Sequence, residues 1–407
     1  MLNKNNEREL AYVVIIENVT PIEGYDRVEL AHVGGWTIVV GKGEFKIGDP
    51  AIYFEIDSKL PEVEPFINME FLAKKHYKIK TQKMCKSISQ GLLMSAANFN
   101  WTIYTNNGNY IVDNNNICHF ATDESRFLTK QLEVTYAMPE DNKRKANSSD
   151  KYKKMAQRHP NLFSKKPIRW LYKKTWGKKI LFLFFGRKKD KRNWPQWVTK
   201  TDEERIENMN YLFNDKSEWI ATEKIDGTST TFTLKRGKKF HKDEFYICSR
   251  NVVFDKPDKK CFYDTNVYIE MAEKYDIYNK MKTMLENIFK DCEWITIQGE
   301  TYGADIQKRD YHMNNHAFMA FNLITSKYGR WNSISMKTIL ESYDIPCVPI
   351  LHEHYILPDT LEELRAYVDS AKSVIDNDMR EGIVFRSHDG TRSFKCVSPT
   401  YLIKYHN

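Results

Sequence analysis

One lysine of this sequence has neighbours that suit a nucleophile. Lys224 lies in the segment Thr222–Ser229, where an apolar strand ends in a turn that contains Asp226 and Gly227. Such a turn presents the lysine at the rim of a sheet. A free lysine has a pKa of about 10.4, so it attacks phosphorus at neutral pH only if desolvation or nearby cations favour its uncharged form. Taken alone, a lysine beside Asp-Gly is more often ordinary hairpin chemistry.

Five further segments follow Lys224 in order along the chain. They are Cys248–Asn251, Ile297–Gly303, Ala320–Leu323, Glu381–Arg386 and Ser393–Lys395. Together with Lys224-Ile225-Asp226-Gly227, they resemble, in the proper sequence, the motifs shared by DNA ligases, RNA ligases and mRNA capping enzymes. Their common order favours a nucleotidyl-transfer site over six unrelated coincidences.

The resemblance implies a nucleotide site. Lys224 would form a phosphoramidate with AMP, and Glu300 would accept hydrogen bonds from the ribose hydroxyls. Phe321 would stack on adenine, and Arg250 would pair with a phosphate through its guanidinium. Glu223 is counted with these nucleotide-binding residues. Considered singly, Phe321 would be a core aromatic, and Glu300 and Arg250 would be exposed residues at a strand end or hairpin.

The resemblance also implies a divalent-metal site. Glu381 would hold a hydrated Mg²⁺, or Mn²⁺, near the α-phosphate of ATP, and Asp226 would position that metal or the attacking end. Lys395 would act with Lys224 in catalysis by neutralising charge on the phosphate. The structural alternatives are a turn cap for Asp226 and surface ion pairs for Glu381 and Lys395.

The acids near Lys224 impose a requirement on this hypothesis. Asp226, Glu300 and Glu381 alone would raise the pKa of a neighbouring lysine, which is the wrong direction for a nucleophile. They suit the site only if a divalent metal or contacts from ATP intervene. We therefore expect ATP and Mg²⁺ or Mn²⁺ as cofactors.

The N-terminal part of the chain has the pattern of a small all-β unit. Short runs of alternating apolar and polar residues, separated by turn signals, cover Ala11–Ile16, Val28–His32, Trp36–Val40 and Ala51–Ile56. From about residue 196, strand-like runs alternate with helical patterns, which are Asp202–Phe213, Tyr268–Lys290 and Leu361–Val374. These patterns predict the α+β fold class with mainly antiparallel pairing. The resemblance further implies an N-terminal all-β OB-like barrel followed by an antiparallel-sheet nucleotidyltransferase domain of the ATP-grasp-like ligase type.

The position of the OB-like unit narrows the family. DNA ligases and capping enzymes carry another OB domain after the motif of Lys395, whereas 12 residues follow Lys395 here. The chain therefore resembles the RNA ligase branch with an N-terminal OB domain, and the segment Lys200–Arg205 strengthens the match, with Arg205 as a further active-site contact. The match departs at Val397, where some RNA ligases have a second lysine, and Lys404 is a weak candidate to replace it.

A basic segment separates the two parts. Residues 141–192 contain 19 Lys or Arg and 3 acidic residues, a net charge of +16 in a chain whose total is +8. Such a block attracts phosphate backbones, but a solvated basic linker explains it equally well. The predicted domains are 1–120 (OB-like), 121–195 (basic connector) and 196–407 (nucleotidyltransferase).

Composition excludes several other classes of protein. The seven cysteines are scattered without any CxxC spacing, which disfavours structural zinc and a disulfide framework. The sequence begins without a signal-peptide pattern and has no long apolar run, so we expect an intracellular protein, cytoplasmic or nuclear, with no membrane partner. The pair His352 and His354 lacks further ligands in the sequence and is assigned no role.

The function predicted is that of an ATP-dependent RNA ligase; its oligomeric state stays open, with a monomer favoured. It would seal 3′-hydroxyl/5′-phosphate breaks in RNA or in an RNA-containing nicked duplex, through lysine-AMP and an adenylylated 5′ end. Two alternatives stay open. One is a non-catalytic RNA-binding protein with a vestigial ligase fold, and the other is a capping-type guanylyltransferase.

Overall fold

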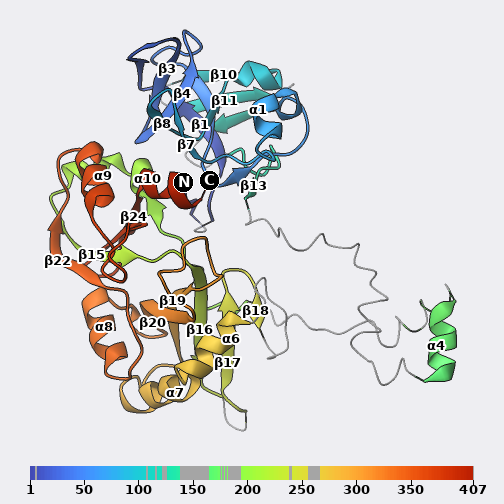
Figure 1. The fold of residues 1–407 in the computed structure, drawn as a ribbon, viewed down its shortest axis with the longest axis vertical. Coiled ribbons are helices and arrows are strands. Elements are labelled where there is room, and N and C mark those ends of the chain that lie inside the picture. Colours follow the sequence, from blue (N-terminus) through green and yellow to red (C-terminus); the bar gives the residue numbers. More distant parts are fainter. Residues whose placement is uncertain are drawn as a thin grey trace. The chain divides into compact units, whose positions relative to one another are not determined.

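The computed structural model describes residues 1–4, 7–106, 109–114, 117–121, 126–137, 165–174, 176, 178, 181, 194–237, 241–254 and 266–406. The chain forms two compact units, of which the first comprises Met1–Ala137 with Trp194–Asn407 and the second comprises Met138–Asn193 (Figure 1). Most of the second unit, and with it most of the predicted basic connector, lies outside the described residues; its helix α4 covers Lys166–Lys173. The boundaries predicted at residues 120 and 195 stay predictions.

The N-terminal part is built from short antiparallel strands, as the alternating pattern predicted. Along β4 the buried side chains are Trp36, Ile38 and Val40, which shows the period of two that buries one face of a strand. The sheets are β1 (Ala11–Ile15), β5 (Pro50–Phe54) and β9 (Leu92–Met94); β2 (Asn18–Ile22), β3 (Tyr25–Val33) and β4 (Trp36–Gly41); β10 (Trp101–Asn106), β11 (Asn109–Asn114) and β12 (Ile117–Ala121); β7 (Thr81–Met84) with β8 (Ser87–Gln90); and β6 (Ser58–Lys59) with β13 (Thr135–Tyr136). A short helix, α1, covers Glu70–Ala73.

The C-terminal part contains two sheets that carry the predicted motifs. The five-stranded sheet has the order β14 (Glu204–Arg205), β24 (Ser393–Val397), β23 (Gly382–Ser387), β15 (Glu218–Lys224) and β22 (Ile350–Ile356). The six-stranded sheet has the order β18 (Val253–Phe254), β17 (Glu244–Ser249), β16 (Thr228–Lys235), β19 (Trp294–Gly303), β20 (His316–Thr325) and β21 (Gly329–Arg330). The β14–β24 pair is parallel and the other pairs are antiparallel, as expected.

Helices cover these sheets (Figure 1). Residues of α7 (Ile277–Asn287) and α8 (Ser333–Glu341) share a buried apolar cluster with the six-stranded sheet, and α9 (Leu361–Ser370) does so with the five-stranded sheet. The remaining helices are α6 (Val267–Lys274) and α10 (Pro399–Tyr405). No helix within the described ranges is both long and apolar enough to cross a bilayer.

Two of the helical patterns do not form the helices expected. Asp202–Phe213 forms the bridge strand β14 and two 3₁₀ turns, because Glu204 and Arg205 pair with β24. The pattern over Tyr268–Lys290 is divided into α6 and α7 by Asp276, whose φ of 48° interrupts the helical backbone.

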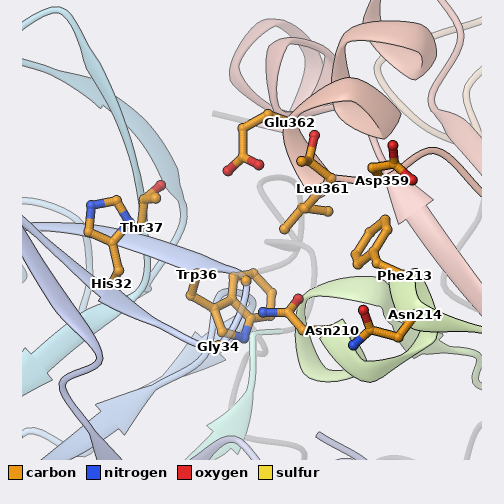
Figure 2. A pocket seen from close by; sticks show the side chains of 12 residues that line it. His32, Gly34, Trp36, Thr37, Asn210, Phe213, Asn214, Asp359, Leu361 and Glu362 are labelled. Carbon is orange, nitrogen blue, oxygen red and sulfur yellow. The ribbon is translucent and has the colours of Figure 1, made fainter.

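A glycine turn joins the two parts of the first unit. The amide of Gly35 donates to the carbonyl of Glu207 at 2.8 Å, and Trp36 Nε1 donates to Asn208 Oδ1 at 2.8 Å. A Cβ on Gly35 would lie 2.7 Å from the backbone Cα of Glu207, so only glycine permits this approach. Figure 2 shows the hollow beside the turn, which contains none of the predicted site residues.

Arg365 anchors the same junction. Its guanidinium donates to the carbonyl of Gly35, to Gln90 Oε1 and to Glu207 Oε1 at 2.9, 2.9 and 3.0 Å. The Glu207 side chain is 1% exposed, so its charge depends on this partner.

Replacing Arg365 should therefore destabilise the protein. Arg365→Leu would leave the Glu207 carboxylate buried without its cation, at a cost of about 3 kcal/mol in the free energy of unfolding measured with urea. Lys327→Leu, which removes an exposed ion pair with Asp291, is the control and should leave the free energy of unfolding close to that of the parent. Equal losses in the two variants would contradict this account of the junction.

Candidate active site

Strand register brings Lys224 and Glu381 together. Lys224 ends β15 opposite Gly382, the first residue of β23, so Glu381 lies beside the lysine. Lys224 Nζ donates to both carboxylate oxygens of Glu381 at 2.7 Å. Burial acts to lower the pKa of Lys224, but Glu381, Glu300 and Asp226 outweigh it and raise that pKa above its ordinary value. The acids thus act in the direction anticipated from the sequence, and the amine needs a further positive charge nearby to become a nucleophile.

A second acid, Asp226, is held from three sides. Its backbone amide donates to Tyr311 Oη at 2.7 Å, and its Oδ2 accepts a hydrogen bond from Tyr401 Oη at 2.8 Å. His406 Nε2 lies 3.2 Å from the same oxygen. Burial acts to raise the pKa of Asp226, but His406 and Lys224 lower it overall. The carboxylate therefore stays ionised.

Asp226, Glu381 and His406 together fit a divalent cation. Each offers a ligand atom, and these atoms lie within 4.8 Å of one another. Two carboxylates match the oxygen preference of Mg²⁺ and Mn²⁺, and an imidazole is a better ligand for Mn²⁺ than for Mg²⁺. His406 was not among the predicted site residues, because a single histidine outside the motifs gives no sequence signal.

Glu300 approaches from the six-stranded sheet. It pairs with Ser229 across β16 and β19, just after the turn that follows Lys224. Gly227 permits this approach, since a Cβ there would lie 2.3 Å from the carbonyl oxygen of Thr301. Burial raises the pKa of Glu300 to about 8, against the lowering effect of Lys224. A protonated Glu300 can donate as well as accept a hydrogen bond.

Phe321 and Glu223 have different surroundings. Phe321 is half-buried on β20, packs beside Ile225 and Tyr302, and has the guanidinium of Arg386 5.8 Å from its ring centre. Glu223 is 2% exposed, and its Oε2 accepts from the backbone amide of Val374 at 2.9 Å. Successive side chains of a strand alternate between faces, so Glu223 is not brought together with Lys224. Its nucleotide-binding role stays a prediction.

The predicted phosphate-binding cations meet on one carboxylate. Lys395 Nζ lies 2.8 Å from Asp202 Oδ1, and Arg250 and Arg8 lie 2.6 and 2.9 Å from Asp202 Oδ2. Burial lowers the pKa of Lys395 to about 8, although Asp202 acts to raise it, and Lys224 contributes to the lowering. The charges of Lys395 and Lys224 therefore act on each other. Asp202 lies in the segment Lys200–Arg205 that strengthened the family resemblance, but no role was predicted for it.

Arg205 connects this group to the OB-like part. Its NH2 lies 2.9 Å from Asp57 Oδ2, and its Nε lies 3.7 Å from Glu55 Oε1. Glu55 is fully buried and also pairs with Arg8. Arg205 therefore lies at the domain junction, next to the cations that Asp202 holds.

Comparison with known protein families identifies both parts. Residues 217–406 match the family model described as RNA ligase, and residues 10–96 match one described as an OB-fold domain.

Residues 217–406 therefore resemble RNA ligases in sequence.

The ligase domain (residues 217–406) and the OB domain (residues 10–96) together have the fold of a solved Naegleria gruberi RNA ligase. Its structure with PPi has a TM-score of 0.68 and 24% sequence identity, and the match covers 97% of this chain and 98% of that chain. A mutant of that ligase with ATP and Mn gives a TM-score of 0.69 at 24% identity, over 98% of this chain and 100% of that chain. Another mutant, with AMP and Mn, gives 0.68 at 24%, over 98% and 99%. No curated protein sequence matches the chain.

The predicted family and fold class are therefore confirmed. The surroundings of Val397 explain why the chain has valine where some RNA ligases have a second lysine. This side chain is buried in an apolar cluster with OB-domain residues that include Tyr12 and Trp36. Lys404, the weak candidate to replace the missing lysine, lies 3.7 Å from Asp378 and is about half exposed.

The raised pKa of Glu300 predicts how the stability of the ligase domain depends on pH. Because the folded pKa of about 8 exceeds the ordinary value of 4.5, the folded state binds this proton more tightly than the unfolded state. The contribution of Glu300 is therefore fully present below pH 4.5 and is lost as pH rises towards 8.

Glu300→Gln removes this titration. Urea unfolding at several pH values should show the variant gaining stability relative to the parent between pH 4.5 and 8. A difference in unfolding free energy that does not change with pH would show that the Glu300 pKa is not raised.

Proposed function

We propose that this chain is an ATP-dependent RNA ligase that joins a 3′-hydroxyl to a 5′-phosphate through an adenylate bound to Lys224. The observation that carries the proposal is the convergence on Lys224 of Glu381, Asp226 and Glu300, in the same electrostatic environment as Lys395. The Naegleria gruberi RNA ligase structures with PPi, with ATP and Mn, and with AMP and Mn support it, because ATP is the substrate, AMP the transferred group, PPi the leaving group and Mn a divalent metal of this chemistry.

The first step is the adenylylation of Lys224. Its Nζ attacks the α-phosphorus of ATP, a P–N bond forms, and the P–O bond to pyrophosphate breaks. A divalent cation held by Asp226, Glu381 and His406 would supply positive charge that favours the neutral amine and offsets charge on the phosphate. Glu381, now 2.7 Å from Nζ, keeps the amine aligned. In this proposal Glu300 would contact the ribose and Phe321 would stack on the adenine.

The next two steps transfer the adenylate and join the ends. An oxygen of the 5′-phosphate attacks the AMP phosphorus, and the P–N bond to Lys224 breaks. The 3′-hydroxyl oxygen then attacks the 5′-phosphorus, and AMP leaves. Lys395 and Arg250 would neutralise the phosphates once the phosphates compete with Asp202 for these two cations.

The OB domain supports a nucleic-acid substrate. OB folds bind single strands through aromatic and basic surfaces, and the net charge of +16 over residues 141–192 would add attraction for the backbone. We propose a nicked duplex with a ribose at its 3′-hydroxyl end as the preferred substrate. The alternatives are a non-catalytic RNA-binding protein and a capping-type guanylyltransferase.

Lys224→Ala should abolish covalent labelling by α-labelled ATP. The parent protein should give a labelled band that resists denaturation, and the loss in the variant should be at least about 100-fold, since alanine has no nucleophile. Lys216→Ala is the control. Lys216 lies eight residues before Lys224, is exposed, and pairs with Asp359.

The labelling outcome also separates the alternatives. Absence of label with Mg²⁺ and with Mn²⁺ would favour the non-catalytic RNA-binding protein. Labelling by GTP in place of ATP would favour the guanylyltransferase.

The substrate preference is tested by sealing. Nicked duplexes that differ only in ribose or deoxyribose at the 3′-hydroxyl nucleotide should seal at different rates, with ribose faster by about 10-fold or more, the effect of one hydrogen-bonded hydroxyl. Equal rates would remove the RNA-specific part of the proposal and leave the ligase chemistry intact.

A further inference from the structure

We propose that Glu218, His354 and His388 form a second metal site, which takes Zn²⁺ or a similar borderline cation and is separate from the site at Lys224. One ligand atom from each side chain lies within 4.8 Å of the other two. His354 Nδ1 lies 2.7 Å from Glu218 Oε2, and the rings of His354 and His388 are stacked with centres 5.1 Å apart.

The strand register explains why the three side chains converge. Glu218 begins β15 and is opposite Ile356 of β22, and His354 precedes Ile356 by two positions, on the same face of that strand. On the other side of β15, Trp219 is opposite Ser387, the last residue of β23. His388 follows Ser387 and so comes beside Glu218. Three adjacent strands thus supply one donor each at one end of the sheet.

The surroundings of His388 support a bound ligand independently. Its Nε2 is shielded from solvent and has no hydrogen-bond partner among the described residues. A shielded ring nitrogen without a partner is rare in proteins, because its desolvation is not compensated. A metal ion, or a hydrogen-bond partner from outside the described residues, would satisfy it.

The donor set selects the kind of cation. Two imidazoles and one carboxylate are common ligands of Zn²⁺, which binds nitrogen at about 2.0–2.1 Å and leaves a fourth position for water. Mg²⁺ prefers oxygen ligands and dehydrates reluctantly, so it would not compete well here. His352 is excluded from the set, because its Nε2 lies 2.8 Å from Tyr367 Oη.

The site lies away from the catalytic residues but on the same strands. Glu218 and Lys224 are the two ends of β15, which at about 3.3 Å per residue places them roughly 20 Å apart. The strand β22 is at the edge of the sheet, and its pairing with β15 is irregular between Trp219 and Thr222. A bound cation would link this edge strand to β15 and to the end of β23. We therefore expect it to raise the stability of the fold and to leave the adenylylation of Lys224 unchanged.

Metal binding by the full chain tests the proposal. After treatment with a chelator, the protein is titrated with Zn²⁺ by calorimetry in excess Mg²⁺, in the background of Glu381→Gln so that the site at Lys224 does not contribute. We expect one Zn²⁺ per chain, with affinity reduced at least about 10-fold by His354→Ala and by His388→Ala. His352→Ala, a histidine two positions away on the same strand, is the matched control and should bind as tightly as its parent.

Two further measurements keep the test decisive. Co²⁺ in place of Zn²⁺ should give the visible absorption of a tetrahedral site, lost in His354→Ala and His388→Ala but kept in His352→Ala. The melting temperature should rise with Zn²⁺ in the parent and the His352→Ala protein only. Absence of stoichiometric binding, or equal binding by all the histidine variants, would overturn the proposal. Neither result bears on adenylylation of Lys224, which is measured separately.

Discussion

The ion pair between Lys224 and Glu381 is the contact on which the arrangement of the active site depends. It joins the last residue of β15 to the residue before β23, so the register of these two strands fixes the distance between the proposed nucleophile, Lys224, and Glu381. The register continues into β24, because Gly382 lies opposite Val397. A Cβ on Gly382 would lie 2.4 Å from the carbonyl oxygen of Cys396, so glycine is needed for β23 and β24 to approach. Backbone geometry, more than flexible side chains, therefore positions the site.

Carboxylates pair with three cations of the candidate site. Glu381 holds Lys224, and Asp202 holds Lys395 and Arg250. A nucleotide must compete with these acids for the same cations, and a divalent metal relieves part of the competition by offsetting their charge. The arrangement thus disfavours weakly charged ligands and favours a polyphosphate that arrives with its metal.

Much of this could be predicted from the sequence, because the signals are local. Alternation of apolar and polar residues located β1, β4 and β5. The ordered motifs located the strands that carry Lys224 and Glu300, and Glu381 just before β23. The remainder depends on contacts between distant residues. Asp202 and Lys395 are 193 positions apart, and no local pattern links them. The same is true of His406, which lies 180 positions from Asp226.

The errors in secondary structure have a similar origin. Apolar periodicity continues across Asp276, while the left-handed backbone that separates α6 from α7 is a property of one residue. The segment Asp202–Phe213 has helical spacing, but pairing of Glu204 and Arg205 with β24 overrides it. Tertiary contacts decide between conformations whose intrinsic preferences differ little.

Val397 shows how closely the OB domain is built into the ligase domain. It follows Lys395 by two positions on β24, so both side chains lie on one face of the strand, and it shares a buried cluster with Tyr12 and Trp36. Leu402 of α10 belongs to the same cluster. A chimaera that exchanged this OB domain for another would expose these apolar side chains and disturb the strand that carries the lysine. Domain grafting would succeed only if β24 and α10 were redesigned together with the new partner.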